Sequence, residues 1–127
     1  MTDDKKTILI VEDEPALLKV YADGLTEEGF RVLQARDGEE GLAAALREGP
    51  NLILLDIVMP KMDGLTMLKK LRAENEWGKY VPVIILTNLD SNAEATNAFA
   101  SLAYDFLVKS NNSIKDVIKI IKEKINV

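Results

Sequence analysis

Five short, strand-like runs rich in apolar residues, separated by longer segments with helical periodicity, constrain the fold of this chain more than any other feature. The runs are Ile8–Val11, Phe30–Ala35, Leu52–Leu55, Val81–Leu86 and Tyr104–Val108. Ile8–Val11 and Leu52–Leu55 each consist of four aliphatic residues in a row, which is typical of a strand buried on both faces. Between and after them, the sequence predicts helices over Pro15–Glu28, Glu39–Glu48, Leu65–Glu74, Asn92–Leu102 and Ser113–Ile125.

Strands that alternate with helices predict an α/β fold, with a doubly wound parallel sheet of five strands and five helices on its two faces. The alternation alone does not give the strand order. In open sheets of this kind the functional crevice lies at the carboxyl ends of the strands. The 127 residues fit one core, and the last predicted helix runs to the end of the chain. We therefore expect a single domain over residues 1–127.

The composition argues against several classes of function. The net charge is −5, so no domain-wide basic field favours direct binding of nucleic acid. The chain has no Cys and no His, which excludes disulfides, thiolate catalysis and the usual zinc ligands. No apolar stretch approaches membrane-spanning length, and the polar first residues do not form a signal peptide. We expect a cytoplasmic protein without membrane insertion.

Carboxylates follow two of the aliphatic runs. The first run leads into Glu12-Asp13-Glu14, and the third leads into Asp56. If these strands are parallel neighbours, Glu12, Asp13 and Asp56 converge at one edge of the sheet and repel one another. A divalent cation relieves this repulsion, and Mg²⁺ suits a site that offers only oxygen ligands.

Two other runs end in polar residues, Thr87 after the fourth and Lys109 after the fifth. Together with the acids they supply a nucleophile, a cation site and fixed hydrogen-bond donors, which are the parts that phosphoryl transfer needs. A carboxylate can form an aspartyl phosphate, so Asp56 is the candidate nucleophile. Taken singly, Asp56 would be a turn residue, Thr87 a satisfied hydroxyl and Lys109 a solvated surface cation.

These residues and their spacing resemble the receiver domain of two-component response regulators, of which the single-domain chemotaxis regulator is the nearest comparison. The matching positions cover essentially the whole chain and are Glu12-Asp13, Asp56, Met59-Pro60, Asp63-Gly64, Thr87 and Asp105–Lys109. The resemblance implies a flavodoxin-like sheet of order 2-1-3-4-5. It also implies that Asp56 accepts a phosphoryl group from a sensor histidine kinase or a histidine phosphotransfer protein.

The resemblance assigns further roles. It implies that Mg²⁺ and its waters are arranged by Glu12, Asp13, Asp56 and the backbone carbonyl of Val58. Thr87 and Lys109 would contact phosphoryl oxygens. Phe106 matches an aromatic position whose rotamer is coupled to Thr87, although a plain core Phe is an equal alternative there.

Some positions that tune the site differ from the family pattern. Ser110 stands where a proline with a cis bond is usual, and we expect a trans Lys109–Ser110 bond because a non-proline cis bond costs about 2.5–4 kcal/mol. Asn88 replaces a smaller residue, so we expect it to narrow access to the site. Val58 and Leu89 are apolar and cannot orient an attacking water, which favours a long-lived phosphoryl state.

The main hypothesis is a stand-alone signalling receiver, a monomer or a phosphorylation-dependent dimer, that passes its state to a downstream protein not identified by the sequence. It would not be an enzyme beyond its own phosphorylation and dephosphorylation. One alternative is a receiver from a larger regulator with an output domain. A second is a small aspartyl-nucleophile phosphohydrolase, although such enzymes carry Asp-x-Asp where this chain has Glu12-Asp13-Glu14. Ile120 lies off the apolar stripe of the last predicted helix, and we expect it to be exposed, with a docking surface as the alternative.

Overall fold

The computed structural model describes residues 5–56, 62, 64–87, 105–108 and 113–125. Along the chain the elements are β1 (Thr7–Val11), α1 (Pro15–Glu27), β2 (Arg31–Ala35), α2 (Gly38–Glu48), β3 (Leu52–Asp56), α3 (Gly64–Glu74), α4 (Glu76–Tyr80), β4 (Val83–Thr87), β5 (Asp105–Val108) and α6 (Ile114–Ile125). The strands form one parallel sheet in the order β2-β1-β3-β4-β5. This is the strand order that the resemblance implied, and the prediction of an α/β fold with a parallel sheet is confirmed.

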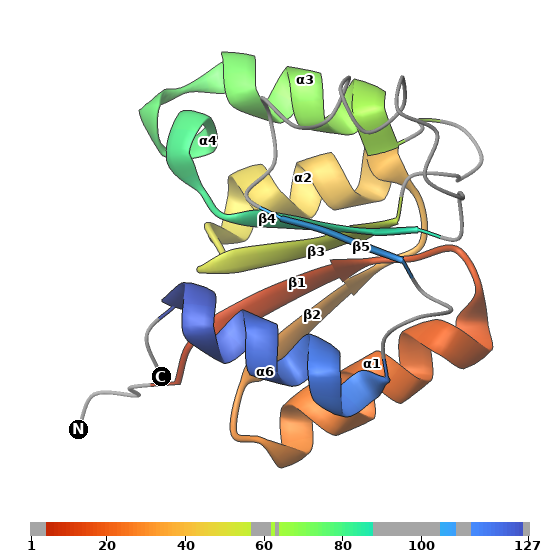
Figure 1. Cartoon of the computed structure of the whole chain (residues 1–127). Helices are drawn as coiled ribbons and strands as arrows, with labels where there is room; N and C mark the ends of the chain where they lie inside the picture. Colours follow the sequence, from red (N-terminus) through yellow and green to blue (C-terminus); the bar gives the residue numbers. More distant parts are fainter. Residues whose placement is uncertain (1–4, 57–61, 63, 88–104, 109–112, 126–127) are drawn as a thin grey trace.

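Helices cover both faces of the sheet (Figure 1). The central strands contribute side chains to a core on each side. The first core cluster, beneath α2, α3 and α4, includes Leu9, Val11, Ile53, Leu55, Val83 and Ile85. The second, beneath α1 and α6, includes Ile8, Ile10, Leu52, Leu54, Ile84 and Leu86. Successive residues of a strand point to opposite faces, so β1, β3 and β4 have no solvated face. This is why they appear in the sequence as unbroken apolar runs.

Local signals set the ends of several helices. Gly29 after α1 has φ 94°, and Gly49 after α2 has φ 57°, a left-handed conformation that side chains with a Cβ rarely adopt. At the start of α6, Ser113 and Asp116 cap each other reciprocally. The Asp116 N–H donates to Ser113 Oγ at 3.2 Å, and the Ser113 N–H donates to Asp116 Oδ2 at 3.1 Å.

The structure departs from the predicted elements in a few places. β3 includes Asp56, and β4 begins at Val83 rather than Val81. The helix predicted over 92–102 lies outside the described residues. The expectation that Ile120 is exposed was wrong, because this side chain is partly buried against the second core cluster. None of the helices described here is long and apolar enough to cross a membrane.

The helix α4 was not predicted, and its stability depends on residues outside it. Its five residues are too few to form a stable helix alone. The Asn75 side chain accepts a hydrogen bond from the Gly78 N–H at 2.7 Å. At the other end, Arg72 of α3 donates from Nη1 to the carbonyls of Gly78 at 3.0 Å and Val81 at 2.6 Å. Arg72 therefore joins α3, α4 and the approach to β4.

We expect the substitution Arg72→Leu to destabilise the protein by about 1–3 kcal/mol, because two carbonyls lose a charged donor. The free energy of unfolding in urea measures this change. Lys70→Leu on the exposed surface of α3 is the matched control and should change stability by less than about 0.5 kcal/mol. Equal losses in the two variants would contradict the structural role of Arg72.

Candidate functional site

The register between β1 and β3 places two of the predicted acids side by side. The last matched pair of these strands is Val11 with Leu55. The residues that follow them are Glu12 after β1 and Asp56 at the end of β3. The Glu12 N–H also donates to the Ala35 carbonyl at 3.0 Å, which extends the pairing of β1 with β2 by one residue. The pairing of the strands therefore fixes the backbone positions of both Glu12 and Asp56.

The structure brings Glu12, Asp13 and Asp56 together. One carboxylate oxygen from each lies within 4.8 Å of the others. Glu12 is 2% exposed and Asp56 is 6% exposed, whereas Asp13 lies at the surface. The Glu14 N–H donates to Glu12 Oε2 at 3.2 Å and orients that carboxylate. The cluster thus has two buried acids with a third at its opening to solvent.

The three acids fit a small divalent cation. Mg²⁺ takes oxygen ligands at about 2.0–2.1 Å, so two ligands on opposite sides of the ion are about 4.2 Å apart. The observed limit of 4.8 Å is only slightly larger than this separation. Burying two carboxylates side by side is unfavourable unless a positive charge compensates them. The residues that could hold the metal are therefore Glu12, Asp13 and Asp56.

Tyr21 of α1 lies close enough to this cluster to sense its charge. It is 4% exposed, and burial raises the pKa of its hydroxyl to about 12, with smaller contributions from the negative charges of Glu12 and Asp56. Side chains two positions apart along a strand point to the same face of the sheet. Glu12 and Asp56 therefore point to the same face as Ile10 and Leu54, which is the face that α1 covers. Nothing in the sequence alone connects Tyr21 with the acids.

The other candidate residues are placed less completely. Thr87 is the last residue of β4 and is paired with Val108, the last residue of β5. Phe106 lies within β5, in register with Ile85. The carboxyl ends of β3, β4 and β5 therefore lie at the same edge of the sheet as the acids. The remaining candidates lie outside the described residues and are Val58, Asn88, Leu89, Lys109 and Ser110.

The raised pKa of Tyr21 predicts a loss of stability at alkaline pH. An acid whose pKa is higher in the folded state stabilises the fold below its unfolded pKa, here 10.0, and this contribution is lost as the pH rises towards about 12. The shift corresponds to roughly 2–3 kcal/mol. Urea unfolding at pH 9 to 12 should therefore show a steeper decline for the wild type than for Tyr21→Phe.

The exposed Tyr80 provides the control for this measurement. It is 63% exposed, so Tyr80→Phe removes a phenol hydroxyl from the surface and is measured beside Tyr21→Phe. Parallel curves for the wild type and Tyr21→Phe would show that the ionisation of Tyr21 is not coupled to folding.

Comparisons with known proteins agree with this geometry. The family model described as the response regulator receiver domain matches residues 8–122. A probable transcriptional regulator, ycf27 of Porphyridium aerugineum, is 37% identical over 105 residues, which are 83% of this chain and 42% of that protein. The response regulator PleD of Caulobacter vibrioides is 39% identical over 102 residues, 80% of this chain and 22% of that protein. The chain thus spans less than half the length of these two relatives.

A solved structure also superimposes on the whole fold. It is the receiver domain of a Pseudomonas aeruginosa sensor histidine kinase with a magnesium ion coordinated in its active-site cleft. The TM-score is 0.87 at 29% identity, and the match covers 97% of this chain and 99% of that one. The family model alone spans most of the chain and includes all three clustered acids. The chain therefore belongs to the family of response regulator receiver domains of two-component systems.

Proposed function

We propose that this chain is a phosphoacceptor switch in a two-component phosphorelay, and that Asp56 is the residue phosphorylated. The observation that carries the proposal is the convergence of Glu12, Asp13 and Asp56 at the carboxyl ends of β1 and β3. Membership of the receiver family supports it. The phosphodonor would be a phosphohistidine on a sensor histidine kinase or a histidine phosphotransfer protein, in the cytoplasm.

The proposed reaction is an in-line displacement at phosphorus. A carboxylate oxygen of Asp56 attacks the phosphoryl group, a new P–O bond forms, and the P–N bond to the donor imidazole breaks. The electron pair of that bond remains on the imidazole nitrogen, which then takes up a proton. Glu12 and Asp13 would hold Mg²⁺, whose positive charge neutralises the phosphoryl oxygens. Glu12 keeps its orientation through the Glu14 N–H.

The output of the switch would come from the change of charge at Asp56. Phosphorylation replaces a single negative charge by roughly two and adds three acceptor oxygens. In this proposal Thr87 and Lys109 contact those oxygens, and Phe106 changes its packing with Thr87. The backbones of β4 and β5 run side by side up to Thr87 and Val108, so such a change reaches both strands. It would shift the population between two packings and so alter the surface offered to a partner.

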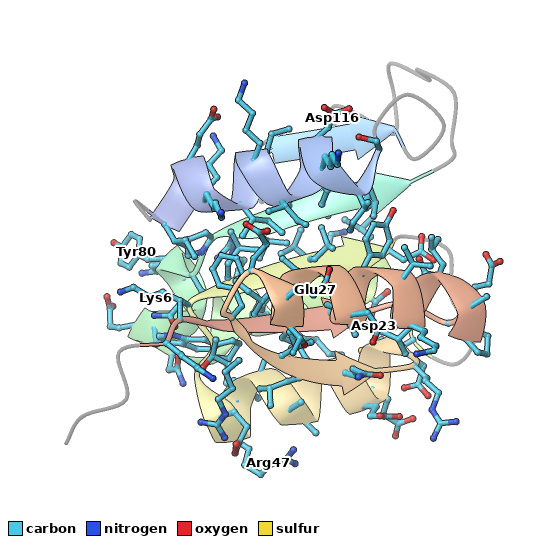
Figure 2. The ribbon with its side chains drawn as sticks, turned by 90° about the horizontal axis from the view of Figure 1, so that it is seen from below. Lys6, Asp23, Glu27, Arg47, Tyr80 and Asp116 are labelled. Atoms are coloured by element: carbon cyan, nitrogen blue, oxygen red, sulfur yellow. The ribbon has the colours of Figure 1, made fainter. Side chains whose placement is uncertain are left out.

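Mg²⁺ should stabilise the folded protein, because the unfolded chain does not hold the three acids together. At a free Mg²⁺ concentration ten times the dissociation constant, the gain is about 1.4 kcal/mol. We expect a much smaller gain in Asp56→Asn. Glu27→Gln, which removes an exposed carboxylate of α1 (Figure 2), should behave like the wild type. Urea unfolding with and without Mg²⁺ tests this, and equal gains in all three proteins would argue against the metal site.

Phosphorylation can be followed by intact-protein mass after incubation with acetyl phosphate and Mg²⁺. The wild type should gain one phosphoryl group, Asp56→Asn should gain none, and Asp23→Asn on the outer surface of α1 should be labelled like the wild type. Labelling of Asp56→Asn to the same extent would refute the assignment. Hydrolysis of a generic phosphomonoester with continuous turnover would instead favour the phosphohydrolase alternative, since the proposed switch has no other substrate.

A second candidate is the same switch within a longer regulator. The observation that favours it is the length of the two curated relatives, of which this chain matches only 42% and 22%. In that case the phosphorylated surface would act on an output region of the same polypeptide. The length of the parent open reading frame decides between the two.

A further inference from the structure

The start of α2 holds the chain that follows Asp56. Gly38 is the first residue of this helix, and its N–H donates to the Met62 carbonyl at 3.1 Å. The first N–H groups of a helix have no acceptor within the helix, so an outside carbonyl satisfies this one. The partial positive charge at a helix N-terminus strengthens the same contact.

Only glycine fits at this position, and the reason is space. A Cβ on Gly38 would lie 2.2 Å from the Met62 oxygen, 2.9 Å from its carbonyl carbon and 3.0 Å from its Cβ. The residue has no left-handed φ, which among the described glycines is found at Gly29 and Gly49. An alanine at position 38 could therefore keep the helical backbone, but either Met62 or α2 would have to move.

This contact fixes the far end of the segment that begins at Asp56. The near end is held by β3, where Asp56 is in register with Leu86 of β4. At the far end, the Met62 side chain packs against the first core cluster.

The same turn of α2 also supports the other strand that carries an acid. A Cβ on Gly41 would lie 2.8 and 2.9 Å from the two Cγ atoms of Val11, the residue before Glu12. The turn itself is fixed by the buried Asp37, whose Oδ1 accepts the Glu40 N–H at 2.8 Å. The first turn of α2 thus contacts both Val11, the residue before Glu12, and Met62, which follows Asp56 by six positions.

We propose that Gly38 is a positioning residue for the acidic site, and that its hydrogen bond to Met62 sets the geometry in which the site binds Mg²⁺ and reacts with a phosphodonor. This inference rests on the proposed function. The coupling between two sites is reciprocal. If the hydrogen bond of Gly38 to Met62 favours Mg²⁺ binding, bound Mg²⁺ must stabilise that hydrogen bond to the same extent.

The first test compares Gly38→Ala with Gly78→Ala. A Cβ on Gly78 would also lie 2.2 Å from a carbonyl oxygen, that of Leu71, but α4 lies at the opposite end of the sheet (Figure 1). Gly38→Ala should weaken Mg²⁺ binding at least tenfold in calorimetric titration and slow labelling of Asp56 by acetyl phosphate. Gly78→Ala should change each by less than twofold, even where it lowers the free energy of unfolding as much. Equal effects of the two variants would overturn the proposal.

The second test uses the wild-type protein and does not depend on the folding of a variant. Saturation with Mg²⁺ should slow hydrogen exchange at the Gly38 amide at least fivefold, with little change at the Gly78 amide. An unchanged rate in a protein that binds Mg²⁺ would refute the positioning role and leave the proposed function intact. A wild type that binds Mg²⁺ but is not labelled at Asp56 would refute the phosphoacceptor assignment, whereas slowed exchange at Gly38 would still support its role at the metal site.

Discussion

The parallel register between β1 and β3 is the constraint on which the site depends. Because Val11 is matched with Leu55, the next residues of the two strands must be neighbours, and these are Glu12 and Asp56. A slip of one residue would send the side chains of one strand to the opposite face. Each strand carries apolar side chains on both faces, so a slipped register would misplace a strand's contribution to both cores. Hydrophobic packing thereby fixes the positions of the charges.

The same packing explains why the acids can be held in an unfavourable arrangement. Two of them are almost fully buried, beside a tyrosine whose pKa they help to raise. Placing carboxylates side by side in a buried site is unfavourable in itself, and the aliphatic packing of the two core clusters helps to hold them there. Each fully buried Leu or Ile contributes about 1.5–3 kcal/mol.

The sequence predicted the parts of the molecule that depend on local periodicity. The aliphatic runs became strands, and the acids converged because parallel neighbours end at the same edge. It did not predict α4, because Arg72 and Asn75 stabilise that helix through contacts that no periodicity shows. Ile120 was misjudged for a related reason, since the core beneath α6 is wider than a single helical stripe. The contact of Gly38 with Met62 joins the start of α2 to a residue 24 positions further along the chain, and only the folded structure reveals it.

The acids are supported from both faces of the sheet, and the supports differ in kind. On the side of α1, the negative charges of Glu12 and Asp56 contribute to the raised pKa of Tyr21. On the side of α2, the backbone of Gly38 lies against the Met62 carbonyl. The backbone of Gly41 lies against the side chain of Val11. The acids are therefore linked to the second core cluster by their charge interaction with Tyr21. They are linked to the first by the close contacts of Gly38 and Gly41 with Met62 and Val11. The sheet separates these two clusters, so the two supports of the acids belong to different helical layers.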